Sequence, residues 1–447
     1  MEILNSDDLY FYSNSPDYSN KNTKTPGLSI ENNIIFSDFY LEVQYFIYLD
    51  ENYFYISDDI RLLRKISQTN LCINGIIQLA IFKANVYPFS IYEKIIPIPC
   101  ASSLKVEKSN IILKKYDFIS KFDDKEKSFF KIHSILYKYM EKAGKNPYIM
   151  YSGGIDSSIC FNYINNPKTI VGSSIFTNEQ LEDVENGIKR FPFYKKNYEY
   201  QKSSNFIETI INYKFFSPFI DLGVYDDLIH VKKSYEMKAT SLINGLGPDE
   251  LMGVAYCRDI GKLQDFDYFI NKYSMLKPKL LYNLFEKERV KFVFEETMKN
   301  YTFDDIKDII HFTIDYHQIP LQHGLTRSNG KYFPTVKRIF PFSNKEFHNV
   351  ILNLPDNLIY NNGIEKYFLR LYAKKILPKN YWTKKKKPFD ADYYKIIKDN
   401  REDIDAFLNT KMKEISQFKQ TNNDISGIEP MDRLNLFMYI NCLKDFK

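Results

Sequence analysis

Hydrophobic and polar residues alternate along the first part of the chain. The stretch "NIIFSDFYLEVQYFIYLDENYFYISDD", residues 33–59, alternates in this way and is rich in aromatic and β-branched residues. Such a pattern predicts short half-buried strands. The stretch "SSLKVEKSNIILKKY", residues 102–116, predicts a hairpin. We therefore expect a first unit built mainly of strands, ending near residue 121.

The spacing then changes to a helical one. The stretch "FFKIHSILYKYMEKAG" has a helical spacing of apolar residues and ends at Gly144, which we interpret as a helix C-cap. Strand-like and helix-like segments follow in turn: "YIMYS", "SSICFNYIN", "TIVGSSIF", "EQLEDVENGIKRF" and "ATSLING". This alternation predicts an α/β unit with a parallel sheet covered by helices. From about Lys262 onward the chain is expected to be mostly helical and rich in Tyr and Phe. The predicted domains are therefore 1–121 and 122–447.

Composition excludes several classes of protein. Hydrophobic residues make up 44% and charged residues 26%, as in ordinary globular proteins. The 61 basic and 56 acidic residues are too evenly balanced to indicate a nucleic-acid-binding protein. Five scattered cysteines without CxxC spacing indicate neither a disulfide framework nor a zinc site. The first residues do not resemble a signal peptide, and no apolar run is long enough to span a bilayer. We expect a cytoplasmic protein with no membrane or nucleic-acid partner.

The glycine pair in "YSGGIDSS" gives the first indication of chemistry. A strand that ends in Ser152, Gly153 and Gly154 and leads directly into a helix presents backbone N–H groups that bind phosphate oxygens. Ser157 and Ser158, like Ser152, add hydroxyl donors. An acid beside phosphate makes best sense as a Mg²⁺ ligand, the role we assign to Asp156. The alternative is an ordinary Gly-Gly turn capped by that aspartate.

A second acidic residue follows another predicted strand. Asp249 lies in "LINGLGPDELMG", after Gly245 and Gly247, so it can reach the same nucleotide site and the same metal. Two carboxylates on Mg-pyrophosphate match a reaction whose leaving group is highly anionic. The alternative for Asp249 and Glu250 is an acidic pair that only favours the start of a helix.

Four motifs in the same order resemble one enzyme family. "SGGIDSS" resembles the pyrophosphate loop of AMP-forming ATP pyrophosphatases. "LINGLGPDELMG" resembles the "SGEGxDELFGG" segment of asparagine synthetases, β-lactam synthetases and lasso-peptide macrolactam synthetases. "FPFSNKEFHNVILNLP" is similar to their "PFLDxxxxxxxLxLP", and "EKYFLRLYAKKILPKNYWTKKKKPF" to their "KxxLRxxxxxxLPxxxxxRxKxxF". More faintly, the first part resembles the back half of the family's glutaminase-type domain.

The resemblance implies a fold and a set of roles. It implies a degenerate N-terminal nucleophile domain of the glutaminase type, followed by a parallel-sheet ATP-pyrophosphatase synthetase domain with a helical C-terminal part. It implies ATP and Mg²⁺ as cofactors and AMP and pyrophosphate as products. Counted along the last motif, the family's catalytic lysine falls on Lys386, within the basic run Lys384–Lys387. The alternative for that run is a solvated loop.

Three positions depart from the family pattern. Glu2 stands where glutamine-dependent relatives carry a cysteine nucleophile, so we expect no glutamine hydrolysis. Leu246 stands where relatives carry a residue suggested to act as a base, and leucine cannot accept a proton. Asn344 replaces the acid of "PFLD". The six histidines are isolated and read as structural, with His323 the most site-like among them.

These observations predict an ATP-dependent ligase that adenylates a carboxylate and joins it to an amine. With no glutaminase, the natural nucleophile is an amine in the same peptide or small-molecule substrate. We expect peptide macrolactam formation, with a precursor peptide or a protease as a partner. Residues 262–335 would line an apolar cleft, the alternative being that these aromatic helices only build the core. Two alternatives stay open, an ammonia-dependent amidotransferase and a catalytically inactive scaffold.

Overall fold

The computed structural model describes most of the chain. The described residues are 9–13, 28–31, 34–50, 53–107, 110–116, 124–164, 166, 168–173, 178–189, 206–215, 217–221, 223–253, 255–326, 333, 335–379, 397–415, 418 and 427–446. Within these ranges, no helix is both long enough and apolar enough to cross a membrane.

A four-stranded parallel sheet lies in the middle of the chain. Its strands are β9 (Pro147–Met150), β10 (Ile170–Gly172), β11 (Ser241–Ile243) and β12 (Lys337–Ile339). Their spatial order is β10-β9-β11-β12, and each neighbouring pair is parallel. The order of strands reverses between β9 and β11, and open α/β sheets bind ligands at the carboxyl ends of strands at such a point. The predicted parallel sheet is confirmed.

Helices cover both faces of this sheet. The helices that follow its strands are α4 (Ile155–Asn162), α5 (Asn178–Ile188), α6 (Phe206–Asn212), α7 (Gly223–Glu236) and α8 (Pro248–Leu251). Successive side chains of a strand point to opposite faces. Accordingly, Tyr148 packs in a cluster with Val231 of α7, whereas Ile149 packs in a different cluster with Ile159 of α4. The short apolar strand β9 is therefore buried on both sides.

Two antiparallel sheets occupy the N-terminal part. The first has the order β1-β5-β4-β6, and the second has the order β2-β3-β7-β8. Their strands are β1 (Leu9–Ser13), β2 (Leu28–Glu31), β3 (Ile34–Ser37), β4 (Phe46–Leu49), β5 (Tyr53–Ser57), β6 (Ile95–Pro97), β7 (Ser102–Glu107) and β8 (Asn110–Lys115). β7 and β8 form the predicted hairpin. The glutaminase-type character of this part and the boundary at residue 121 stay predictions.

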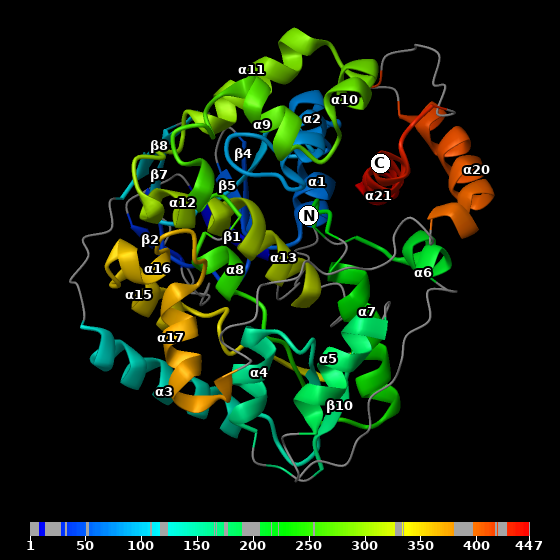
Figure 1. The fold of residues 1–447 in the computed structure, drawn as a ribbon. Helices are drawn as coiled ribbons and strands as arrows, with labels where there is room; N and C mark the ends of the chain where they lie inside the picture. The colour runs from blue at the N-terminus through cyan, green and yellow to red at the C-terminus, as the bar shows by residue number, and fades with distance from the viewer. Residues whose placement is uncertain are drawn as a thin grey trace.

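Most of the other regular elements of the described chain are helices (Figure 1). In the first part they are α1 (Ile60–Ser67), α2 (Ile73–Phe82) and α3 (Lys125–Glu141). Beyond residue 256 they are η2 (Cys257–Asp259), α9 (Phe266–Lys272), α10 (Pro278–Leu284), α11 (Lys287–Met298), α12 (Ile306–Thr313), the π-helical turn η3 (Ile314–Gln318), α13 (Ile319–Gly324), α15 (Lys345–Leu352), α16 (Asp356–Ile359), α17 (Tyr367–Ile376), α20 (Arg401–Lys411), η5 (Met412–Glu414), α21 (Pro430–Leu443) and η6 (Lys444–Phe446). The helix predicted before Gly144 is α3, which begins at the N-cap Asp124 and ends three residues before this glycine, whose φ is +79°.

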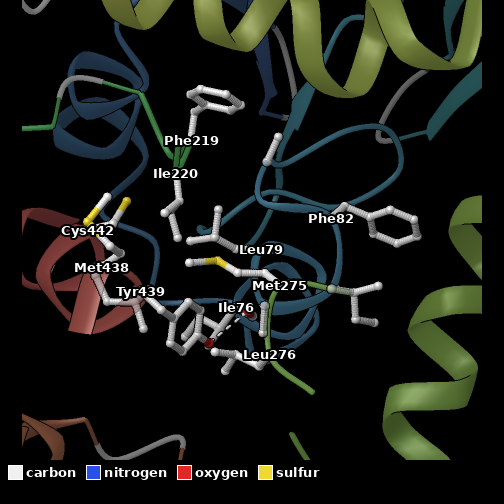
Figure 2. Packing of buried hydrophobic residues seen from close by; sticks show 14 of the residues in the cluster. Ile76, Leu79, Phe82, Phe219, Ile220, Met275, Leu276, Met438, Tyr439 and Cys442 are labelled. Atoms are coloured by element: carbon white, nitrogen blue, oxygen red, sulfur yellow. Dashed lines mark hydrogen bonds between the residues drawn. The ribbon is translucent and has the colours of Figure 1, made fainter. Parts of the chain in front are cut away.

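The N-terminal part shares a core with the last helices. All residues of α2 from Gly75 to Phe82 are buried, so this helix is enclosed on every side. Figure 2 shows Ile76 and Leu79 of α2 among side chains that lie far away in the sequence, including Met275 and Tyr439. The hydroxyl of Tyr439 donates a hydrogen bond to the carbonyl of Ile76 at 2.9 Å. Residues on both sides of the predicted boundary therefore build one hydrophobic cluster.

Candidate functional site

The glycine pair forms the turn between β9 and α4. Gly153 has a φ of +72°, a conformation that favours glycine, and Gly154 is the N-cap residue of α4 without a side-chain cap. The hydroxyl of Ser152 lies 3.1 Å from that of Ser157, and these two groups fold the turn over the start of the helix. Because no side chain caps α4 at Gly154, the start of this helix has the geometry that favours anion binding. The hydroxyl of Ser158 instead lies in the core, 3.2 Å from the Tyr151 hydroxyl.

The loop after β11 lies directly against this turn. A Cβ added to Gly245 would lie 3.2 Å from the backbone nitrogen of Ser157, so the glycine allows the two loops to approach closely. Gly247 has a φ of +122°, and a Cβ there would lie 2.5 Å from the hydroxyl oxygen of Ser343. Both loops follow the carboxyl ends of neighbouring parallel strands. The two predicted nucleotide-binding segments therefore meet at the switch point of the sheet.

Lys366 joins the two predicted metal ligands. Its ammonium group forms ion pairs with Asp156 and with Asp249, the latter at 2.9 Å. The side chain is only 4% exposed, and the residue has a φ of +52° at the N-cap of α17. Burial alone would lower the pKa of Lys366, but the charges and hydrogen bonds of the two carboxylates raise it above its ordinary value. The lysine therefore stays charged and holds both carboxylates together.

Asp156 and Asp249 fit a magnesium ion that is shared with phosphates. Both carboxylates contact one cationic group, so they converge on one point. In the described part of the chain, no group of three or more His, Cys, Asp or Glu side chains could hold a metal alone. Mg²⁺ commonly takes one or two protein carboxylates and completes its shell with substrate phosphates and water. The pair matches that pattern.

A pocket of about 320 Å³ opens beside this cluster, with Asp249 in its wall. Glu250 and His317 also line the pocket. The ring Nδ1 of His317 lies 3.3 Å from Glu250, and its Nε2 lies 3.3 Å from Asp221. Burial alone would lower the pKa of His317, but its hydrogen bonds to Asp221 and Glu250 and their charges raise this pKa to about 9. The imidazole is therefore a cation held between two carboxylates.

His317 and Lys366 were missed as site residues. His317 belongs to η3, a π-helical turn, and such turns are frequent at functional sites. No sequence spacing predicts that turn. Lys366 is the lysine of the stretch "EKYFLRLY" and matches the lysine that opens the family motif "KxxLR", so the motif itself could have identified it as a site residue.

His323, the histidine expected to be the most site-like, is buried, and its Nδ1 accepts a hydrogen bond from the Gln44 backbone at 3.2 Å. Burial lowers its pKa to about 4, which fits the structural role expected of it.

The remaining predicted positions have these locations. Lys386 and the basic run around it, like Glu2, lie outside the described residues. Leu246 packs against the large hydrophobic cluster, and its carbonyl accepts a hydrogen bond from Ser343 at 2.7 Å. Asn344 is the N-cap of α15 and accepts from the backbone of Phe347 at 2.9 Å. Asparagine is one of the residues preferred at a helix N-cap, so at this position it has a structural role.

Residues 335–422 match the sequence model of the family described as asparagine synthase. The predicted resemblance to the asparagine synthetase family is therefore confirmed over this segment. No curated protein matches the chain. Among solved structures, an NH3-dependent NAD synthetase from Campylobacter jejuni subsp. jejuni NCTC 11168, in complex with the nitrate ion, is 14% identical to this chain. That match covers 40% of this chain and 95% of the synthetase, with a TM-score of 0.23.

Proposed function

We propose that this protein is an ATP-dependent ligase that adenylates a substrate carboxylate, releases pyrophosphate and then forms an amide. The match over residues 335–422 supports an ATP-dependent amide-forming ligase in general. The observation that carries the finer proposal is that Asp156 of α4 and Asp249 of α8 both pair with Lys366, while Gly245, in the loop before α8, lies against the start of α4. This arrangement offers N–H donors, one ammonium group and two carboxylates at one edge of the sheet.

Each group has a task in this reaction. The backbone N–H groups of the turn and of α4 bind phosphate oxygens and orient the triphosphate. Asp156 and Asp249 would hold Mg²⁺, which neutralises the charge of the departing pyrophosphate. Lys366 keeps both carboxylates in place and adds positive charge beside the phosphates. Lys386 keeps the role implied by the family motif, stabilising the oxyanion as the amine adds.

The first experiment measures pyrophosphate. The purified chain is incubated with ATP, Mg²⁺ and short peptides that carry an acidic side chain and a free amino terminus. We expect AMP and pyrophosphate in equal amounts, and Asp156→Asn should reduce their release at least 10²-fold, as removal of an electrostatic group at such a centre does. Lys374→Met, an exposed position on α17, serves as the control. Release of ADP and phosphate would contradict an adenylate, and no turnover with any carboxylate would favour an inactive scaffold.

The second experiment identifies the bond. We propose an intramolecular amide between an acidic side chain and an amine of one peptide, because tethering supplies proximity worth about 7–11 kcal/mol of the barrier. A precursor peptide is thus the substrate and partner to test, by mass spectrometry after incubation with ATP. We expect loss of one water, blocked when the amine is acetylated. An added amide derived from ammonia would instead identify the amidotransferase.

A further inference from the structure

The pocket beside Asp249 is lined by aromatic rings and by the acidic side chains of Asp249 and Glu250. Its rings come from α2, from the chain around α9 and from η3; they are Phe82, Tyr256, Phe269, Tyr273 and Tyr316. Several of these rings fix one another: Phe82 and Phe269 have centroids 5.2 Å apart, and Tyr256 and Tyr273 have centroids 4.6 Å apart. The walls are therefore rigid π surfaces, which attract a cation placed over their faces.

Glu250 carries a carboxylate oxygen that lacks a partner. Oε1 contacts the imidazolium of His317, whereas Oε2 is buried and has no hydrogen-bond partner among the described residues. The side chain is 13% exposed, and the carbonyl of the same residue is fixed by the Thr313 hydroxyl at 2.7 Å. A buried acceptor without a donor destabilises the protein, because the loss of its hydration is not compensated. A ligand that brings an N–H donor into the pocket would remove this cost.

The charges around the pocket are balanced. The charged lining groups and their direct partners comprise four carboxylates and four cations: Asp221, Asp249, Glu250 and Asp259 against Lys83, Lys272, His317 and Lys366. Lys272 is committed to Asp259 at 2.5 Å, and both ring nitrogens of His317 face carboxylates. An amine therefore meets no excess of positive charge here, and the unpartnered carboxylate oxygen belongs to Glu250.

We propose that this pocket is the subsite for the substrate's amine, bound as a primary ammonium by Glu250 and the surrounding aromatic rings. This inference rests on the proposed ligase function, because the amine is the second reactant of that reaction and needs a binding site beside the adenylated carboxylate. Asp249 lies in the wall of the pocket and also pairs with Lys366 of the nucleotide cluster. An amine held here is therefore adjacent to the position where the carboxylate would be adenylated. His317 is a positioning residue that fixes the Glu250 carboxylate.

The test uses two probes that differ only in the charged group. Isothermal titration calorimetry at pH 7.5, without ATP, compares 2-phenylethylamine with 2-phenylethanol on the full chain. We expect the wild type to bind the amine at least 10-fold more tightly than the alcohol. Glu250→Gln keeps the shape but removes the charge, so it should abolish this preference, whereas Glu288→Gln, at an exposed position of α11, should keep it.

Two results would overturn the proposal. One is equal affinity of the wild type for amine and alcohol, which needs no variant and so does not depend on how Glu250→Gln folds. The other is an unchanged amine preference in a Glu250→Gln protein whose circular dichroism matches the wild type. Because these titrations contain no nucleotide, their failure leaves pyrophosphate release as a separate measurement. If the wild type binds the amine as expected but releases no pyrophosphate from ATP, the proposed ligase function is wrong, and the proposed amine site is not.

Discussion

Lys366 places one ammonium group between two carboxylates that come from the first turns of two separate helices, α4 and α8. Its backbone is left-handed at the start of α17, a conformation that costs a non-glycine residue free energy. Such a conformation persists when its surroundings fix it, and here the two ion pairs with Asp156 and Asp249 do so. The residue thus links the C-terminal family segment to the nucleotide loops.

A double-mutant cycle tests this link. Lys366→Met leaves two converging carboxylates without a counter-charge, so we expect it to lower the free energy of unfolding by about 2–4 kcal/mol. Adding Asp156→Asn to the Lys366→Met variant should recover part of that loss, because one negative charge then remains at the site and no longer repels a second carboxylate. A coupling of about 1–3 kcal/mol measured by urea unfolding is the expected result. Strictly additive losses would mean that the ion pair does not exist in solution.

His317 makes stability depend on pH. Its pKa is raised from 6.5 to about 9 in the folded protein, so the stabilising charge is fully present below pH 6.5 and is lost as the pH rises through 9. His317→Gln should therefore be less stable than the wild type at pH 6, by about 1–3 kcal/mol. That difference should shrink toward pH 10. Thermal unfolding of both proteins across this range is the measurement, and a constant difference would argue against a charged imidazole.

The loops after β9 and β11 depend on glycine for their contact. Gly245→Ala would place a Cβ 3.2 Å from the Ser157 nitrogen, at the start of the helix that is proposed to bind phosphate. The loops must then separate by a few tenths of an ångström. Because small displacements of positioning groups are costly in catalysis, we expect pyrophosphate release to fall at least tenfold with little loss of stability. Gly427→Ala, where an added Cβ meets no atom within 4 Å, should leave it unchanged.

Local pattern was sufficient to predict the elements that surround the nucleotide loops. β9, α4, β10, α5 and β11 follow the predicted alternation, because short apolar strands and helix starts leave a local signature. The pocket left no such signature. Phe82, Glu250 and His317 are more than sixty residues apart in sequence, and only the folded chain brings α2, α8 and η3 to the wall of one pocket. The aromatic helices of residues 262–335, expected to line an apolar cleft, mainly build the core and contribute only a few rings to the pocket wall.

At the scale of the whole molecule, α2 determines how the parts are coupled. The backbone N–H groups of Met275 and Leu276 donate to the carbonyls of Ile81 and Ala80 at 3.1 and 3.0 Å, so the chain before α10 is tied to the end of α2. α11 packs along the same helix, and α21 contributes Tyr439 (Figure 2). The wall of the pocket proposed to bind the amine is therefore built by the N-terminal helix α2 as well as by elements from the second half of the chain.

This coupling predicts that the chain unfolds as one unit. Leu79 of α2 is fully buried between N-terminal and C-terminal side chains, so Leu79→Ala should remove about 2–5 kcal/mol from the free energy of unfolding. Because the cavity would lie in the shared cluster, the whole calorimetric transition should move to lower temperature and stay single. Ile112→Ala, on a side chain of β8 that is 52% exposed, should change it little. If Leu79→Ala instead split the transition into one shifted and one unshifted peak, the N-terminal part would be an independent domain, and the amine pocket would have to form without its α2 wall.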